Sequence, residues 1–301
     1  MNIPVVFRII RIHIVLGGFL AFSLGALLAV AGGGHFNFIF FALGYLVVLL
    51  GDLSSHYSND YFDVEVDKYI EQKKFFAGSN ILVKNPNLRS ISRSVSIALL
   101  VSSNVLACIL VFFGAPIEFF IVILGASLVG WFYSAPPLRF ISRGFGEFAV
   151  ACVTGFAIPG LGYLAIRGQF DLLFVYLSIP FIMYGLMLSL SLQVPDIEID
   201  NKGKKRNLAV RLGQRRVFSL ILAMASFAAL TFWIYIWFNV ILLADFWVVA
   251  LFSFIPLISG FVGYIAGFGK KKVNTISTLN VASLFVFNVL MIVYLLIITL
   301  L

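Results

Sequence analysis

The sequence "FFALGYLVVLLGDLSSHYSNDYFDVEVDKYI", residues 40–70, joins an apolar run to a cluster of acidic and amide side chains. The run is apolar enough to form a membrane helix, which needs about 20 mainly apolar residues. The cluster comprises Asn59, Asp60, Asp63, Glu65 and Asp67. Ionisable groups at membrane depth are costly and normally face a bundle interior or a watery cavity. This stretch therefore predicts a membrane helix whose polar end faces an interior site.

The rest of the chain has the same apolar character. Of its 301 residues, 61% are hydrophobic and 11% are charged, whereas soluble domains carry about 25% charged residues. We predict an all-α polytopic membrane protein in which residues 1–301 form a single bundle of nine transmembrane helices. The predicted spans lie near residues 9–32, 36–58, 91–113, 117–135, 147–166, 171–194, 216–238, 246–268 and 279–301.

The first apolar run allows two interpretations. Arg8 and Arg11 precede it, and it ends in Ala29-Val30-Ala31, which resembles a signal-peptide cleavage site. The run is longer than the usual signal-peptide core of about 7–15 residues. We therefore expect a retained span, with cleavage as the alternative.

The basic residues indicate the orientation. With these spans, every Lys and Arg except Arg167 lies on one side of the membrane. The positive-inside rule then places the N-terminus in the cytoplasm and the C-terminus outside. The net charge of +8 is thus a topological signal that also suits anionic lipid headgroups or an anionic substrate. It does not indicate nucleic-acid binding, because the basic residues are divided among loops. We expect the plasma membrane, with a site near its cytoplasmic face.

The cysteines and histidines do not suggest a metal centre. Cys108 and Cys152 each lie inside an apolar run and are expected to pack there. The three histidines have no ligand spacing, so the sequence does not indicate zinc.

The first acidic cluster has helical spacing. Asn59, Asp63 and Asp67 are four residues apart and should share a helix face. Asp52 and His56 fall on nearly the same stripe, which extends the polar ridge into the span. Alternatively, these acids only solvate the helix end, but solvation requires neither the spacing nor an Asn. We expect Asp60 to border the ridge and Glu65 to point away.

A second acidic cluster lies in "VPDIEIDNKGKKRNLAVRLG", residues 194–213, where Asp196 and Asp200 are again four apart. Both clusters follow predicted spans that end on the same side. Four converging carboxylates would repel one another unless cations lay among them. Mg²⁺ suits such a site because it takes one or two carboxylates and completes its shell with water and phosphate oxygens.

Basic residues follow each cluster, as a diphosphate would require. Lys73 and Lys74 follow the first, and Lys202, Lys204, Lys205 and Arg206 follow the second. Taken singly, each could instead be a charge that sets the orientation of its loop. We expect the two longer loops, residues 68–90 and 196–215, to cap the site.

A third segment is "WFYSAPPLRFISRGFGE", residues 131–147. The Pro-Pro pair ends the fourth predicted span. Arg139 and Arg143 follow four apart, and Tyr133 lies just inside the span. The alternative is a plain turn with charges that set the orientation of the loop.

Together these motifs resemble the UbiA superfamily of intramembrane prenyltransferases. Asn59-Asp60-x-x-Asp63-x-x-x-Asp67 is similar to the first family motif, and Asp196-x-x-x-Asp200 with "GKKRNLAVRLG" is similar to the second. The segment "AGSNILV", residues 77–83, resembles the "GGSGxLV" of the MenA-like, menaquinone-pathway branch. Pro195 and Asn207 depart from that branch, which usually has a polar residue and a Thr there.

The resemblance implies Mg²⁺-dependent transfer of an isoprenyl group from a polyprenyl diphosphate to a lipophilic, aromatic acceptor, such as 1,4-dihydroxy-2-naphthoate in quinone biosynthesis. Two Mg²⁺ ions would be held, one by Asp63 and Asp67 and the other by Asp196 and Asp200. Asn59 would be a neutral ligand or orienting group, and Tyr133 would face the allylic cation or position the acceptor. The expected diphosphate-binding residues are Lys73, Arg139, Arg143 and Lys204.

The sequence also allows alternative functions. Within the enzyme class, the acceptor could be geranylgeranylglyceryl phosphate, a chlorophyll precursor or haem. An ion-coupled transporter would also carry intramembrane acids, though nearer the midplane. A non-catalytic membrane scaffold would have no need for two matched Asp pairs.

Overall fold

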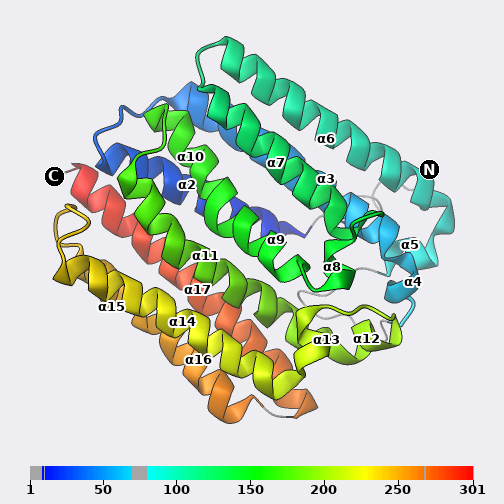
Figure 1. The fold of residues 1–301 in the computed structure, drawn as a ribbon. Helices are drawn as coiled ribbons and strands as arrows, with labels where there is room; N and C mark the ends of the chain where they lie inside the picture. The colour runs from blue at the N-terminus through cyan, green and yellow to red at the C-terminus, as the bar shows by residue number, and fades with distance from the viewer. Residues whose placement is uncertain (1–8, 10, 70–79, 268, 301) are drawn as a thin grey trace.

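The computed structural model describes residues 9, 11–69, 80–267 and 269–300. In this part of the chain, every regular element is a helix (Figure 1). Nine helical segments within it are long and apolar enough to cross a membrane. The predicted all-α fold with nine membrane helices is therefore confirmed.

The spans are built from single helices or from helices joined end to end. They are α2 (Ile12–Ala31), α3 (Phe38–Phe62), η1 with α6 (Pro86–Leu88 and Arg89–Phe112), α7 (Ile117–Ser134), α9 with η2 and α10 (Gly146–Cys152, Val153–Ala157 and Ile158–Arg167), α11 with η3 and α12 (Leu172–Gln193, Val194–Asp196 and Ile197–Lys202), α14 (Gln214–Trp237), α15 with α16 (Trp247–Phe252 and Phe254–Ala266) and α17 (Lys270–Leu300). Four short helices connect them: α4 (Val64–Asp67), α5 (Ile81–Lys84), α8 (Phe140–Arg143) and α13 (Leu208–Leu212).

Several helices extend beyond their predicted ends. The second span was predicted to end near residue 58 and continues to Phe62, and the sixth continues through η3 and α12 to Lys202. These extensions contain Asn59 and Asp60 of the first motif and both aspartates of the second. Their polar side chains lower the hydropathy of the segment, but the helix continues through them. The predicted ends were therefore wrong in the segments that carry the motifs.

Six spans surround a central cavity. The segments α2, α3, α7, α9–α10, α11 and α17 all contribute to its lining. The α6 helix packs outside against α3 and α7, whereas α14 packs against α11 and α16 packs against α14 and α17 (Figure 1). No cavity-lining side chain comes from the described parts of α6, α14, α15 or α16. These outer helices therefore support the inner ring.

The short helices α4, α5, α8, α12 and α13 gather at one end of the bundle, which we call the polar end (Figure 1). The α12 helix contacts both α4 and α13. This contact brings the segment after α3 beside the segment after α11, although the two are far apart in sequence. The fold thus places the two acidic motifs at the same end.

Serine side chains join α3 to α6. The Ser54 hydroxyl donates to the Ser96 carbonyl at 2.9 Å, and the Ser96 hydroxyl donates to the Ser54 carbonyl at 2.9 Å. Ser103 donates to the Val47 carbonyl at 2.7 Å. Serine is small enough to let membrane helices pack closely, and its hydroxyl can form a hydrogen bond to the facing helix. The outer face of α3 is therefore fastened to α6, while its other face lines the cavity.

Glycines allow α2 and α10 to pack at backbone distance. A Cβ atom at Gly162 would lie 2.0 Å from the Phe22 carbonyl oxygen, and one at Gly25 would lie 1.8 Å from that of Pro159. Both distances are shorter than any side chain can tolerate. These two glycines therefore determine how close α2 lies to α10.

Candidate active site

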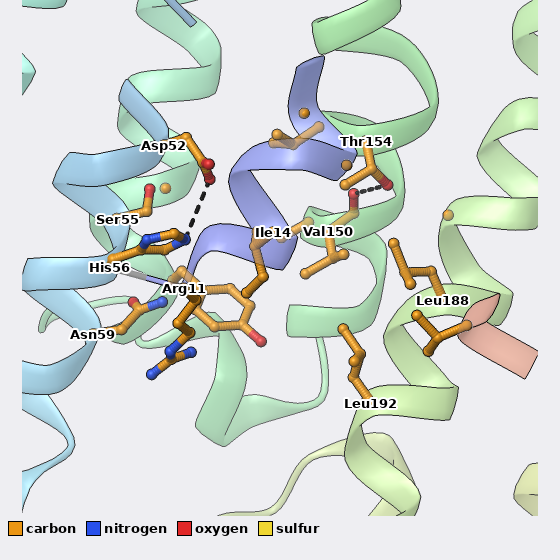
Figure 2. A pocket seen from close by; sticks show the side chains of 18 of the residues that line it. Arg11, Ile14, Asp52, Ser55, His56, Asn59, Val150, Thr154, Leu188 and Leu192 are labelled. Carbon is orange, nitrogen blue, oxygen red and sulfur yellow. Dashed lines mark hydrogen bonds and ion pairs between the residues drawn. The ribbon is translucent and has the colours of Figure 1, made fainter. Parts of the chain in front are cut away.

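The cavity inside the ring has a volume of about 390 Å³, within the size range of small-molecule sites. Figure 2 shows two unlike walls. The polar wall consists of α3 side chains with Arg11, the residue that precedes α2, and the facing wall is mainly apolar. The labelled residues of the polar wall are Arg11, Asp52, Ser55, His56 and Asn59, and those facing them are Val150, Thr154, Leu188 and Leu192. Such a cavity can hold a molecule with one polar and one apolar part.

The first acidic motif keeps its helical register across a break in the helix. Asp63 joins α3 to α4, and its N–H donates to the Asn59 carbonyl at 2.9 Å. The N–H of Asp67 donates in turn to the Asp63 carbonyl at 2.9 Å. All three side chains line the cavity, as the spacing predicted. Glu65 is exposed and pairs with Lys68 at 2.6 Å, so it points away from the cavity.

Two further contacts fix this motif. Arg11 Nη2 lies 2.8 Å from Asp60 Oδ1, so the residue before α2 is tied to the polar end of α3. Ser134 on α7 donates its hydroxyl to Asn59 Oδ1 at 2.9 Å. The Asn59 amide is thereby oriented toward α7. Asp60 is buried in its ion pair and also lines the cavity.

The second acidic motif reaches the same cavity from α11 and α12. Asp196 lies in η3 and Asp200 in α12, and both line the cavity. Asn207 Nδ2 donates to Asp200 Oδ2 at 2.7 Å, while Asn207 Oδ1 accepts from the Val210 N–H at 2.8 Å and caps α13. The structure thus brings Asp63 and Asp67 together with Asp196 and Asp200.

Lys205 lies between the two motifs. Its Nζ is 2.9 Å from Asp63 Oδ2 and 3.7 Å from Asp200 Oδ1, and the side chain is buried. Burial disfavours the charged form, but the two carboxylates outweigh it and raise the pKa of Lys205 above its ordinary value. The ammonium therefore stays charged and links the first motif to the second.

The charge of Lys205 alone does not balance the four carboxylates of the two motifs. Burial, followed by the charges of Asp60 and Asp63, raises the pKa of Asp67 to about 8. Asp63 Oδ1 is buried without a hydrogen-bond partner among the described residues. Further positive charge would stabilise the ionised carboxylates, and their oxygens are the donors that Mg²⁺ prefers.

The carboxylates face one another without forming a ready-made metal cage. Within the described ranges, no three His, Cys, Asp or Glu side chains are grouped closely enough to hold a metal ion. Mg²⁺ usually takes few protein ligands and fills its shell with water and substrate phosphates. The donor set therefore fits a cation that shares its ligands with a bound phosphate group.

The predicted basic residues do not line the cavity. Arg143 and Lys204 are exposed, Arg139 is half-buried, and none of the three is among the lining residues. Lys73 lies outside the described residues. The bases in the cavity wall are Arg11 and Lys205, which sequence reasoning did not select.

The local backbone explains why Lys205 was missed. Lys204 has a positive φ of 58°, and the N–H of Lys205 donates to the Asp200 carbonyl at 2.9 Å. This turn directs Lys205 inward and leaves Lys204 exposed. The sequence "KKR", residues 204–206, does not indicate which of its three basic side chains points into the cavity. Tyr133, by contrast, lines the cavity from α7 as predicted.

The described residues thus form a bundle of nine candidate membrane spans, with two Asp motifs that face each other at one end of a cavity that has a polar and an apolar wall. This arrangement is that of a membrane-embedded enzyme. The UbiA prenyltransferase family model matches residues 19–289. The chain therefore belongs to the UbiA prenyltransferase family and is an integral membrane prenyltransferase.

Individual relatives agree with this assignment. The chain is 26% identical over 106 residues to 1,4-dihydroxy-2-naphthoate octaprenyltransferase of Bacillus subtilis (strain 168). That match covers 35% of this chain and 33% of the relative, so it spans about a third of the relative's length.

Solved structures share the fold over nearly the whole chain. A UbiA homolog from Archaeoglobus fulgidus bound to DMAPP and Mg²⁺ is 18% identical, with 98% of each chain covered and a TM-score of 0.74. A digeranylgeranylglyceryl phosphate synthase is 15% identical, with 96% of this chain and 97% of the other covered and a TM-score of 0.68.

Proposed function

We propose that the protein transfers a prenyl group from a polyprenyl diphosphate to an aromatic, membrane-soluble acceptor of the 1,4-dihydroxy-2-naphthoate type, with Mg²⁺ as cofactor. The observation that carries the proposal is the pair of Asp motifs facing one cavity with Lys205 between them. The Bacillus subtilis relative supports this acceptor class. The Archaeoglobus fulgidus homolog, bound to DMAPP and Mg²⁺, supports the donor and the cofactor.

The acidic motifs would bind the donor through metal. Asp63 and Asp67 would hold one Mg²⁺ and Asp196 and Asp200 a second, with Asn59 as a neutral ligand or orienting group. The bound metal would stabilise the negative charge that develops on the leaving diphosphate. Lys205 is buried between the motifs and would donate to the same diphosphate. Lys73, Arg139, Arg143 and Lys204 would attract the anionic donor to the polar end.

The apolar wall would bind the prenyl chain of the donor. Val150, Leu188 and Leu192 would contact the prenyl chain and exclude water, which would otherwise quench an allylic cation. The ring of Tyr133 lines the cavity and would present its π-face to that cation. The two walls would therefore keep the diphosphate and the prenyl chain in separate surroundings.

The membrane placement belongs to the same proposal. The protein would lie in the plasma membrane, and the Lys and Arg distribution supports an orientation with its polar end and its N-terminus toward the cytoplasm. The segments around α4–α5 and α12–α13 would cap the site of a single-domain bundle. The diphosphate group of the donor would then lie toward the cytoplasm, while its prenyl chain and the acceptor would enter from the membrane.

The test is a transfer assay with purified protein in detergent. The protein is incubated with a panel of prenyl diphosphates, 1,4-dihydroxy-2-naphthoate and Mg²⁺, and products are resolved by mass spectrometry. We expect a prenylated naphthol product that is absent in excess EDTA. Asp63→Ala and Asp196→Ala should each lower the rate by a factor of about 1,000 or more without unfolding the protein, because a carboxylate ligand is lost.

Glu65→Ala is the matched control, because Glu65 lies in the same acidic stretch but is exposed and faces away. It should keep nearly full activity. Activity in excess EDTA, or full activity of both Asp variants, would refute the metal assignment. Prenylation of geranylgeranylglyceryl phosphate in place of the naphthoate would refute the acceptor class while leaving the donor assignment intact.

A further inference from the structure

The cavity contains a second polar pair, which extends the stripe of the first acidic motif further along α3. Asp52 and His56 lie one turn apart on α3 and both line the polar wall (Figure 2). His56 precedes Asp63 by seven residues, which is about 10 Å along a helix that rises about 1.5 Å per residue. The pair therefore lies deeper in the membrane than the carboxylates of the proposed diphosphate site.

The His56 imidazole is buried and incompletely satisfied. Its side chain is only 4% exposed, and His56 Nε2 lies 3.6 Å from Asp52 Oδ1. Neither ring nitrogen has a hydrogen-bond partner among the described residues. Buried polar atoms are nearly always hydrogen-bonded in proteins, because burying them alone is costly. An imidazole of this kind in a cavity wall is suited to bonding a ligand.

The surrounding charges leave this pair available. Arg11 and His13, at the beginning of α2, line the same cavity and are the basic groups whose charges act on His56. Arg11 is paired with Asp60 at 2.8 Å, so its charge is largely balanced there. The Ser55 hydroxyl is bonded to the Gly51 carbonyl at 3.2 Å. Asp52 is thus the carboxylate that can orient and stabilise a protonated His56.

We propose that His56, oriented by Asp52, binds a hydroxyl group of the aromatic acceptor and accepts its proton. This inference rests on the proposed function and assigns the acceptor's position in the cavity. Nε2 faces Asp52, which leaves Nδ1 as the proton acceptor. The acceptor class is accordingly a hydroxylated aromatic ring, whose nucleophilicity increases when the hydroxyl loses its proton.

The reaction is balanced in atoms and electrons. The hydroxyl proton moves to His56 Nδ1, and the electron pair left on oxygen enriches the ring carbon. That carbon forms a bond to the first carbon of the prenyl group, whose bond to oxygen breaks, and the electron pair leaves with the diphosphate. The substituted ring carbon then loses its hydrogen as a proton to a diphosphate oxygen. His56 returns its proton to the ring oxygen, which restores the aromatic hydroxyl.

The main test compares His56→Asn with wild type. The Asn amide resembles the Nδ1 side of the imidazole but cannot accept a proton. We expect kcat to fall by a factor of about 100 or more, in the range typical of general-base catalysis. The Kd for the prenyl diphosphate in the presence of Mg²⁺ should change by less than about threefold, because the donor site lies elsewhere.

A second measurement distinguishes the loss of proton transfer by His56 from a structural effect of the substitution. A fluorinated acceptor, whose hydroxyl ionises more readily, should recover at least about tenfold of the lost rate in His56→Asn and gain much less in wild type. Asp52→Asn should lower kcat by a factor of about 10 and show the same selective recovery. His35→Asn is the control, because His35 is exposed in the segment before α3 and should leave activity unchanged.

Each alternative outcome is decisive. A kcat for His56→Asn within threefold of wild type overturns the proposal, as does a uniform rate loss that the fluorinated acceptor does not relieve. Equal loss of donor binding would also overturn it, because the pair would then serve the donor site. Failure of the proposed function would be distinguishable, since wild type itself would show no transfer and no Mg²⁺-dependent donor binding.

Discussion

Lys205→Met would remove the cation that links the two acidic motifs. The Lys205 ammonium is 2.9 Å from one carboxylate oxygen and 3.7 Å from another. At an effective dielectric constant of about 20, these contacts correspond to about 6 and about 4 kcal/mol of Coulomb attraction. Desolvation of the buried ammonium offsets several kcal/mol of this sum. We therefore expect a loss of about 3–5 kcal/mol in the free energy of unfolding, the range measured when one partner of a buried ion pair is removed.

The assay is unfolding in detergent, followed by tryptophan fluorescence, in the presence of EDTA. Lys204→Met is the matched control, because Lys204 is adjacent in sequence but exposed, and it should change the free energy of unfolding by less than about 0.5 kcal/mol. Adding Mg²⁺ with a non-reactive prenyl diphosphate analogue should narrow the deficit of Lys205→Met, because the metal would then neutralise the carboxylates.

A double-mutant cycle measures the contact directly. Asp63→Asn and Lys205→Met, singly and combined, should show a coupling energy of about 1.5 kcal/mol or more. A coupling energy near zero, or an unfolding free energy of Lys205→Met equal to wild type in EDTA, would refute the assignment of Lys205 as the link between the motifs.

Three other predictions follow from the geometry. Burial raises the pKa of Asp67 to about 8 in the folded protein, whereas the ordinary pKa of an aspartate is 3.8. In metal-free protein, the contribution of Asp67 to the free energy of unfolding should therefore fall as the pH rises from about 4 to about 8. Asp67→Asn should remove this pH dependence when the free energy of unfolding is measured at a series of pH values. Gly162→Ala should destabilise by about 2 kcal/mol or more, because its methyl group would meet the Phe22 backbone; Gly125→Ala, in open space, should be neutral or stabilising by about 0.5–1 kcal/mol in the same thermal unfolding assay. Asn207→Ala removes the bond to Asp200 and the cap of α13, so kcat/KM should fall by about tenfold while donor analogues still bind in a titration.

The sequence predicted the features that depend on local periodicity. Apolar runs predicted nine spans, and four-residue spacing predicted that Asn59, Asp63 and Asp67 share a face. The same stripe predicted the ridge that contains Asp52 and His56. Each of these inferences requires only the geometry of one helix, which residue spacing determines.

The features that depend on tertiary contacts were not predictable. The Arg11–Asp60 ion pair requires that the beginning of α2 meet the end of α3, which no residue spacing encodes. The inward direction of Lys205 depends on the backbone of a single turn. Helix ends were missed because acidic residues that face a cavity remain helical, although a hydrophobic window counts them as loop.

The serine contacts between α3 and α6 also bear on how the protein is made. These helices are consecutive spans, so both leave the ribosome long before α11. Their hydroxyl groups satisfy one another's backbone carbonyls without help from later helices. A two-helix hairpin of this kind can assemble as soon as it enters the bilayer. During synthesis, α3 would then be fixed against α6 first, and the acidic motif at its end would remain in the membrane until the second motif is translated.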